Sequence, residues 1–196
     1  MKNQNIITAV ILAGGQGRRM NGLDKGLVKL QGMPIFTYVF NILKKQVPHI
    51  AISANRNIAH YQQYHTPVVS DTLPDYPGPL AGMLAAMETL NSEWFLFCPC
   101  DTPNIPGDLF ARLWEAHNNS QALVFWVNDG QRDHPTLALL HHSLRIQLRT
   151  YLTRGERRVL HFMRQAGGQA VVFPFPEHFK NINTPDQLYC YRKMAP

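Results

Sequence analysis

The sequence predicts an α/β fold, namely a Rossmann-like, doubly wound and mostly parallel sheet with a mixed second half. Over the first 120 residues, short apolar runs alternate four times with segments of helical periodicity. Such alternation is typical of parallel strands joined by right-handed helical crossovers. The first apolar run, residues 7–12, also leads into a glycine-rich turn. In this fold class, ligands bind beyond the carboxyl ends of the strands.

The first half of the chain contains four predicted strand–helix pairs. Apolar residues at helical spacing, from Phe36 to Leu43, predict a core-facing helix with Pro34 at its first position. The other pairs follow from apolar runs that end in polar residues. The predicted strands are residues 7–12, 50–55, 67–71 and 94–98, and the predicted helices are residues 34–46, 57–64, 80–90 and 106–117.

The second half is more mixed. The segment Asn128–Gln131 has the composition of a hairpin turn or loop. A final helix is predicted from Thr184, a capping residue that is followed by Pro185. The predicted strands are residues 123–127, 135–140, 170–173 and 179–182, and two further helices are predicted at residues 143–153 and 156–165. Without a linker or an internal repeat, residues 1–196 are predicted to form one domain.

Composition and charge limit the class of protein. The net charge is +6 and the pI is about 9.4, which suits anionic partners such as a nucleotide or a phosphorylated small molecule. Basic residues occur only singly or in pairs, so nucleic-acid binding is disfavoured. No apolar run is long enough to span a bilayer. The amino terminus lacks a signal peptide, and three cysteines make no disulfide framework, so a reducing cytoplasm is expected.

The glycine turn after the first strand has the features of a polyphosphate-binding loop. Its glycines allow a close approach of the backbone to a ligand, and Arg18, Arg19 and Lys25 add positive charge. It is not a Walker A loop, which needs Gly-Lys-Ser/Thr, and the dinucleotide fingerprint fails because Met20 occupies the third glycine position. A glycine-rich turn with solvated arginines remains the alternative.

Polar residues follow the other three predicted parallel strands. Ser53 and Asn55 end the second strand, Asp71 ends the third, and Asp101 closely follows the fourth. Parallel strands end at one edge of the sheet, so these side chains are expected to converge. Asp101 is the best candidate ligand for Mg²⁺, which is commonly held by one or two carboxylates and substrate phosphates. The alternative is a turn or capping aspartate.

Two cysteines, Cys98 and Cys100, lie beside this candidate metal ligand. The only other cysteine is Cys190, so a four-ligand zinc site would need histidines from elsewhere in the chain. Free cysteines usually behave as small apolar residues in the core. A zinc site is therefore disfavoured.

Several motifs together resemble those of a known family. Leu12-Ala13-Gly14-Gly15, Arg19-Met20 and Asp24-Lys25 are similar to the signature of nucleotidyltransferases that use nucleoside triphosphates. The later stretches 71–82, 94–103, 132–135 and 181–185 extend the similarity nearly end to end. The chain resembles the bacterial molybdenum cofactor guanylyltransferases, which join the GMP moiety of GTP to molybdopterin. The resemblance implies a nucleotide-diphospho-sugar transferase-like fold.

The resemblance also implies roles for individual residues. Arg19, Lys25 and Asp101 would be catalytic, and Asp101 would hold Mg²⁺. Two positions depart from the family pattern: Ser53 stands where asparagine is frequent, and Gly17 where serine is frequent. The implied nucleotide contacts are Leu12, Ala13, Gly14, Gly15, Lys25, Ser53, Asn55, Asp71, Gly78, Gly82 and Asp101.

The second half would bind the acceptor. Residues 1–120 would form the nucleotide-binding half and residues 121–196 the acceptor-binding half. From the residues alone, the asparagines before Thr184 could equally be a helix-capping arrangement. The implied acceptor contacts are Asp133, His134, Arg157, Asn181 and Asn183. The expected partners are GTP, molybdopterin, other molybdenum-cofactor biosynthesis proteins and apo-molybdoenzyme chaperones, for a protein expected to be a cytoplasmic monomer.

Three alternative functions stay open at this stage. A cytidylyltransferase acting on the same pterin would differ in the loop after Leu12 and in the region from Pro77 to Gly82, which here resembles the guanylyl version. A sugar-phosphate nucleotidyltransferase would usually be longer. A non-catalytic carrier of the cofactor would bind the pterin without needing Asp101 for chemistry.

Overall fold

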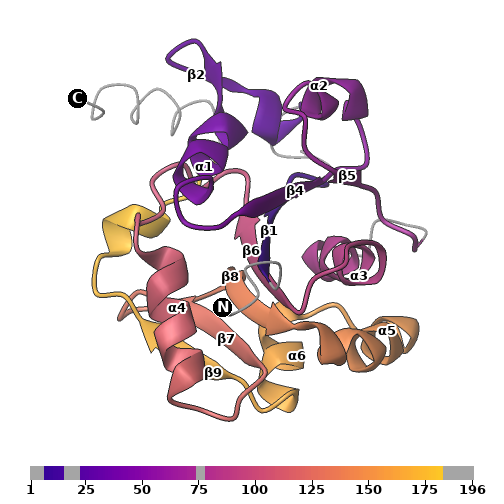
Figure 1. The fold of residues 1–196 in the computed structure, drawn as a ribbon, viewed down its shortest axis with the longest axis vertical. Helices are drawn as coiled ribbons and strands as arrows, with labels where there is room; N and C mark the ends of the chain where they lie inside the picture. The colour runs from indigo at the N-terminus through magenta and orange to yellow at the C-terminus, as the bar shows by residue number, and fades with distance from the viewer. Residues whose placement is uncertain (1–6, 16–22, 74–77, 183–196) are drawn as a thin grey trace.

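The computed structural model describes residues 7–15, 23–73 and 78–182, and its main feature is a seven-stranded sheet (Figure 1). The strand order is β5-β4-β1-β6-β8-β7-β9. β8 is antiparallel to both of its neighbours, and all other pairs in this sheet are parallel. The strands are β1 (Ile7–Leu12), β4 (His49–Ser53), β5 (Val68–Val69), β6 (Trp94–Pro99), β7 (Val124–Asn128), β8 (Asp133–His141) and β9 (Gln169–Val172).

Helices cover both faces of the sheet, which confirms the predicted doubly wound architecture. Side chains alternate between the two faces of β1, so that Ala9 and Ile11 enter one apolar cluster and Val10 enters the other. The first cluster includes side chains of α1 (Ile35–Leu43), α2 (Ile58–Gln62) and α4 (Leu109–Asn118). The second includes those of α3 (Pro79–Thr89), α5 (Arg145–Thr153) and α6 (Val159–Gln165).

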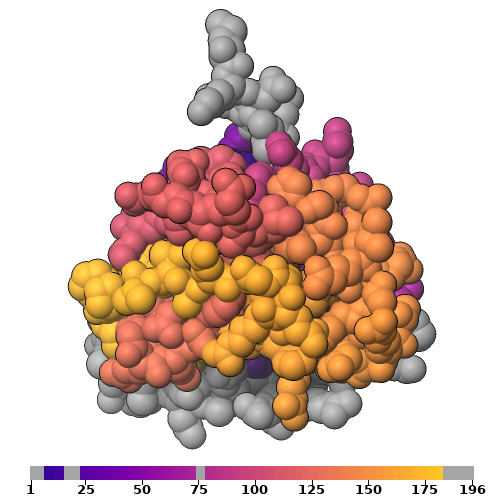
Figure 2. All heavy atoms as spheres, turned by 90° about the horizontal axis from the view of Figure 1, so that it is seen from below, coloured from indigo at the N-terminus to yellow at the C-terminus, as the bar shows by residue number. Residues whose placement is uncertain are grey.

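The strand order places a topological switch point beside β1. The chain leaves β1 for β4 on one side, and it later crosses by α3 to β6 on the other side. In open α/β sheets, this reversal opens a crevice at the carboxyl ends of the two central strands. The residues that follow β1 and β6 are therefore well placed to bind a ligand. The second half continues the sheet beyond β6, and its orange and yellow segments share one face in Figure 2.

A small hairpin before α1 was not predicted from the sequence. β2 (Lys29–Leu30) and β3 (Met33–Pro34) pair antiparallel around Gln31 and Gly32, which have φ values of 49° and 86°. Positive φ at both central residues is the geometry of a tight hairpin turn. Pro34 thus ends β3, and the prediction that it begins the helix is wrong because α1 starts at Ile35.

The strand predicted over residues 179–182 is also wrong. Pro176–Phe179 form a short 3₁₀ helix, η5, and irregular backbone follows it. Pro176 has no N–H to donate to a strand ladder, and it starts the 3₁₀ helix that ends at Phe179. Phe179 and Ile182 are nevertheless buried, so the apolar pattern reflected burial and not strand pairing. The helix predicted from Thr184 lies outside the described residues.

Several predicted elements are present but shorter than expected. The helices predicted from Pro106 and from residue 156 begin at Leu109 and Val159. The strand predicted at residues 67–71 contains only Val68 and Val69. Two 3₁₀ turns complete the described elements: η3 (Lys25–Leu27) and η4 (His142–Leu144). Among the described helices, none combines the length and the apolar character that crossing a membrane requires.

Candidate active site

The carboxyl ends of the central strands are held together by backbone hydrogen bonds. The N–H of Cys100 donates to the carbonyl of Leu12 at 3.1 Å, and the N–H of Ala13 donates to the carbonyl of Ser53 at 2.7 Å. These bonds continue the pairing of β1 with β6 and β4 past the ends of the strands. The segments after β1, β4 and β6 therefore start from one rigid edge, as the sequence predicted.

Five of the predicted nucleotide contacts lie together at this edge. Asn55 Nδ2 donates to Asp71 Oδ2 at 2.8 Å, and Asn55 Oδ1 accepts from the N–H of Asp71 at 2.8 Å. A Cβ on Gly14 would lie 3.0 Å from Asn55 Nδ2, and one on Gly82 would lie 2.5 Å from Ser53 Oγ. Only glycine fits at position 82 without movement of its neighbours, so α3 packs closely over the end of β4.

Asp71 has a carboxylate oxygen without an internal partner. Its Oδ1 atom is buried and, within the described part of the chain, accepts no hydrogen bond. Burial raises the pKa of Asp71, and the hydrogen bond from Asn55 opposes that rise. A buried acceptor without a donor is costly for a folded protein. The site is therefore suited to a ligand that brings an N–H donor.

The free energy of unfolding should be lowered by the burial of an ionised Asp71 carboxylate. Because the folded pKa is raised, ionisation disfavours folding above that pKa, and the penalty vanishes below the unfolded pKa. Asp71→Asn, which keeps an oxygen for Asn55, is expected to have a higher urea midpoint than the wild type at pH 7. The difference should shrink at pH 4.5. Asp108→Asn, at an exposed aspartate, is the control. A less stable Asp71→Asn variant at pH 7 would contradict this assignment.

The side chains of Lys25, in η3, and Asp101, just after β6, approach each other at this edge of the sheet. Lys25 Nζ lies 3.3 Å from Asp101 Oδ2, and Asp101 is only 9% exposed. Burial raises the pKa of Asp101, while the charge and hydrogen bond of Lys25 oppose the rise. The second oxygen, Oδ1, is buried and has no hydrogen-bond partner among the described residues. The pair thus presents one cation and one available carboxylate oxygen.

The donor set around Asp101 fits a hard divalent cation that also binds substrate. Asp101 Oδ1 is a buried carboxylate oxygen without a hydrogen-bond partner among the described residues, and carboxylate oxygens are ligands that Mg²⁺ prefers. Within residues 7–15, 23–73 and 78–182, no group of three or more His, Cys, Asp or Glu side chains could hold a metal. From these residues, a metal at Asp101 would have to complete its coordination with phosphate oxygens and water. Cys98 and Cys100 are buried, free cysteines, as expected for core residues.

Three of the predicted acceptor residues, Asp133, His134 and Asn181, lie at this same edge. Thr102 Oγ1 donates to Asn181 Oδ1 at 2.9 Å, and the N–H of Ile182 donates to the carbonyl of Asp101 at 2.8 Å. These two bonds attach the segment that contains Asn181 to the segment after β6. His134 lies near the start of β8, and because β8 is antiparallel its start lies where the neighbouring strands end.

His134 and Asp133 both have strong internal partners. His134 Nε2 lies 2.7 Å from Asp129 Oδ2. Burial alone would raise the pKa of Asp129, but hydrogen bonds from His134 and from two backbone N–H groups lower it to about 2. Asp133 accepts from Trp126 Nε1 at 2.9 Å, from Asn128 Nδ2 at 2.8 Å and from Arg164 Nη2 at 3.0 Å. Its carboxylate is therefore largely occupied within the protein.

The remaining predicted residues are less closely connected to the cluster. Arg157 Nη1 donates to the carbonyls of Leu152 and Glu156, both at 2.7 Å, so it closes the turn between α5 and α6. Gly78, with a φ of 89°, precedes the first turn of α3. Arg19 and Asn183 lie outside the described residues.

Comparison with known proteins establishes the family. Residues 9–170 match the family model described as the MobA-like NTP transferase domain. A molybdenum cofactor guanylyltransferase of Serratia proteamaculans (strain 568) is 48% identical over 179 residues, which cover 91% of this chain and 90% of that protein. The chain belongs to the molybdenum cofactor guanylyltransferase family. A guanylyltransferase of Yersinia pestis (strain Pestoides F) is 46% identical over 180 residues, or 91% of each chain.

The fold agrees with that of a solved structure. The molybdopterin-guanine dinucleotide biosynthesis protein A of Archaeoglobus fulgidus superposes with a TM-score of 0.75, covering 96% of this chain and 98% of that chain at 21% identity. The agreement confirms the predicted nucleotidyltransferase fold. In this member of the guanylyltransferase family, the Lys25–Asp101 and Asn55–Asp71 pairs lie at the edge of the sheet where the parallel strands end.

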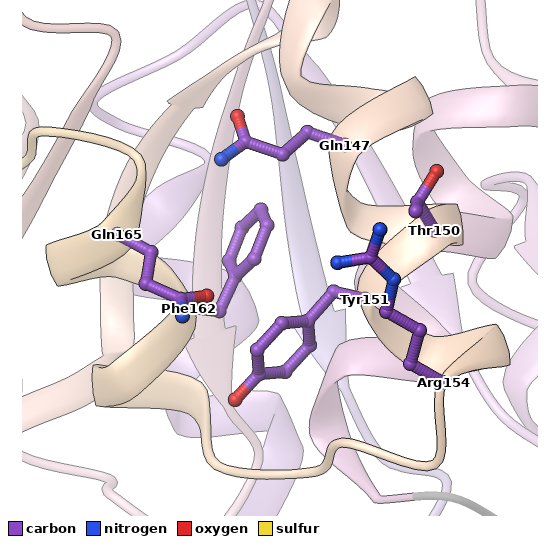
Figure 3. Close-up of a pocket in the computed structure, with 6 residues that line it drawn as sticks. All are labelled: Gln147, Thr150, Tyr151, Arg154, Phe162 and Gln165. Carbon is purple, nitrogen blue, oxygen red and sulfur yellow. The ribbon is translucent and has the colours of Figure 1, made fainter.

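A separate pocket lies between α5 and α6, as Figure 3 shows. Its volume is about 340 Å³, and the rings of Tyr151 and Phe162 form part of its wall. None of the predicted site residues of this guanylyltransferase family member lines it. The lining residues are Gln147, Thr150, Tyr151, Arg154, Phe162 and Gln165.

Sequence reasoning missed the side chains that surround Asp24. Tyr61 Oη donates to Asp24 Oδ1 at 2.8 Å, Asn57 Nδ2 donates to Asp24 Oδ2 at 3.0 Å, and the N–H of Gly26 donates to Asp24 Oδ1 at 3.1 Å. Asp24 is only 7% exposed. The motif Asp24-Lys25 pointed to this place in the chain, but no pattern linked it to residues of α2.

Proposed function

We propose that this chain transfers the GMP moiety of GTP to molybdopterin, with Mg²⁺, and releases pyrophosphate. The observation that carries the proposal is a pair of buried carboxylate oxygens, Asp71 Oδ1 and Asp101 Oδ1, at one edge of the sheet, neither of which has a hydrogen-bond partner among the described residues. One suits a base that donates N–H groups, and the other suits a metal bound to phosphates. The names of the relatives at 48% and 46% identity support the same activity.

Guanine is the base that this site would accept. Its N1–H and N2–H₂ groups are donors, and Asp71 Oδ1 is a buried acceptor that has no donor within the described parts of the chain. Asn55 holds the other oxygen of Asp71 and so sets the orientation of the carboxylate. Gly82 lets α3 pack closely over the end of β4, beside Ser53 and Asp71. Gly14, Ser53 and Asn55 would line the approach of the nucleoside.

The chemistry requires positioning and charge, and no covalent protein intermediate. A phosphate oxygen of molybdopterin attacks the α-phosphorus of GTP, a new P–O bond forms, and the bond to the β-phosphate oxygen breaks. Lys25 and Arg19 would neutralise the negative charge that develops on the departing pyrophosphate. Mg²⁺ held by Asp101 would supply further charge stabilisation there. Orientation of the two phosphates would contribute much of the remaining rate.

The second half would hold the acceptor. His134, Asn181 and Asn183 are proposed to border the pterin, and Arg157 to meet its phosphate, with Asp133 orienting the start of β8. Because one sheet runs through both halves, we further propose a single domain with a nucleotide half (1–120) and an acceptor half (121–196). The protein is further proposed to be a cytoplasmic monomer that passes its product to molybdoenzyme chaperones.

Pyrophosphate release tests the proposal directly. The assay would contain Mg²⁺, molybdopterin and, in turn, GTP, CTP or ATP. Release with GTP is expected to exceed that with CTP or ATP by about 100-fold or more. Adenine and cytosine each place a ring-nitrogen acceptor beside their amino donor, so they match the carboxylate of Asp71 less well than the adjacent N1–H and N2–H₂ donors of guanine. Preference for CTP would keep the fold and overturn the base assignment. No release with any nucleotide, together with retained pterin binding, would favour a carrier.

A further inference from the structure

The Asp24 network, defined as Asp24, Arg56, Asn57 and Tyr61, lies beside the proposed catalytic lysine. Asp24 immediately precedes Lys25 and begins the short helix η3. Its carboxylate side chain is 4% exposed and accepts hydrogen bonds from Asn57, Tyr61 and the N–H of Gly26. The two side-chain donors come from α2 and the residue before it, so the network attaches the backbone that leads into Lys25 to a separate element.

Arg56 extends this network to the glycine turn. Arg56 Nη2 donates to the carbonyl of Gly15 at 3.1 Å and to the carbonyl of Leu23 at 2.7 Å. These two carbonyls flank residues 16–22 of the sequence. Arg56 Nε also lies 4.0 Å from Asp24 Oδ2. One guanidinium group thus joins the end of the turn after β1 to the segment that leads into Lys25.

We propose that Arg56 and Asp24 are positioning residues that set the distance between the glycine turn and the Lys25–Asp101 pair. The proposal rests on the proposed function, since it assigns the triphosphate of the nucleotide to the space between these groups. Neither side chain would touch the reacting atoms. Displacement of a catalytic group by about 1 Å can cost about 100-fold in rate, so the loss of this attachment should affect phosphate binding and turnover.

An arginine suits this position better than a lysine would. The planar guanidinium presents several N–H donors in a fixed arrangement, whereas the ammonium of lysine is a compact point charge on a flexible stem. A lysine at position 56 could approach one carbonyl but could not hold both while remaining near Asp24. The variant Arg56→Lys therefore separates geometry from charge.

The central experiment compares Arg56→Met with Arg112→Met. Arg112 is also half-buried, and its Nη2 donates to the carbonyl of Val172 at 2.7 Å. The control variant therefore removes a similar hydrogen bond from an arginine to the backbone, at a position far from Lys25 in the sequence. Arg56→Met is expected to lower kcat/KM for GTP about 10- to 100-fold. Arg112→Met should stay within about twofold of the wild type, and Arg56→Lys should recover only a small part of the loss.

Equilibrium binding distinguishes positioning from general damage to the fold. Under this proposal, the Asp24 network positions the groups around the triphosphate, whereas Asn55 and Asp71 belong to the base site. Arg56→Met should therefore bind GTP about tenfold more weakly while its affinity for GMP stays within about twofold. Equal losses for GTP and GMP, or a kcat/KM for GTP like that of the wild type, would overturn the proposal.

Exchanging the side chains of Asp24 and Asn57 provides a second test that does not depend on Arg56. Asp24→Asn places an amide donor opposite the Asn57 amide donor, and Asn57→Asp places two carboxylates together. The double variant restores one donor facing one acceptor, and aspartate tolerates the left-handed backbone at position 57, where φ is 51°. Each single variant is expected to lose about tenfold in GTP affinity, and the double variant should recover most of it.

Failure of this proposal is distinguishable from failure of the proposed function. If the wild type releases pyrophosphate from GTP but Arg56→Met matches it, only the positioning role is wrong. If the wild type releases none, the guanylyltransferase proposal fails, and the ratio of GTP to GMP affinity in the wild type and Arg56→Met still decides the positioning role. An unchanged ratio in that case would refute it.

Discussion

Replacing Asp101 with asparagine is expected to reduce pyrophosphate release from GTP by about 1,000-fold or more. The substitution keeps the shape of the side chain but removes the negative charge at a position that is 9% exposed. Asp101 Oδ1 is buried and has no hydrogen-bond partner in the part of the chain that the structure describes, and a neutral amide is a much weaker ligand for a divalent cation. Lys25 would also lose its ionic partner.

The fold should survive this change. Burial raises the pKa of Asp101, which means that the ionised carboxylate is held at a cost that asparagine avoids. The melting temperature of Asp101→Asn should therefore equal or exceed that of the wild type at pH 7. Asp108→Asn is the matched control, because Asp108 is an exposed residue on the same connection between β6 and α4 and its side chain makes no capping hydrogen bond. Its activity should match that of the wild type.

Binding measurements would show whether the loss is due to the metal. The wild type should bind GTP more tightly with Mg²⁺ than with a chelator present. Asp101→Asn should bind GTP with an affinity that does not respond to Mg²⁺. If the variant retained both the Mg²⁺ response and the activity, Asp101 could not be the metal ligand.

The convergence of the nucleotide site could be predicted because it follows from parallel strands. Each of Asn55, Asp71 and Asp101 comes just after an apolar run, and the carboxyl ends of parallel strands meet at one edge. Local sequence therefore carried enough information to group these residues. The hydrogen bonds between Asn55 and Asp71, which are 16 residues apart, are a finer consequence of that same geometry.

The Asp24 network could not be predicted, because it depends on the packing of distant segments. Asn57 and Tyr61 lie 33 and 37 residues from Asp24, and neither belongs to a recognisable motif. Tyr61 is fully buried and looks like an ordinary core aromatic residue in the sequence. Only the docking of α2 against the start of η3 brings the phenol to the carboxylate.

The position of the acceptor residues could be predicted only in part, because the local sequence does not determine the direction of a strand. His134 lies at the functional edge only because β8 runs antiparallel to β6 and β7. The segment from Phe179 to Ile182 is attached to the cluster through the N–H of Ile182 and the side chain of Asn181. Those are tertiary contacts of an irregular segment, and its apolar residues had suggested a strand.

Replacing Lys25 with methionine should lower kcat/KM for GTP by about 100-fold, and it should also change the pH dependence of the remaining activity. Lys25 lowers the pKa of Asp101 against the larger effect of burial. Without the ammonium group, burial acts alone and the pKa of Asp101 rises further. Activity that needs ionised Asp101 would then be lost at a higher pH than in the wild type as the solution is acidified.

The measurement is kcat/KM for GTP between pH 5 and 9 in the wild type, Lys25→Met and Lys25→Arg. The acidic limb should move to higher pH in Lys25→Met and return toward the wild-type position in Lys25→Arg, which restores a positive charge beside the carboxylate that lies 3.3 Å from Lys25 Nζ in the wild type. Lys45→Met, at an exposed lysine just after α1, should change neither the rate nor the limb. A lower rate with an unmoved limb would mean that Lys25 acts on the phosphates alone, because ionisation of Asp101 would then not depend on its neighbour.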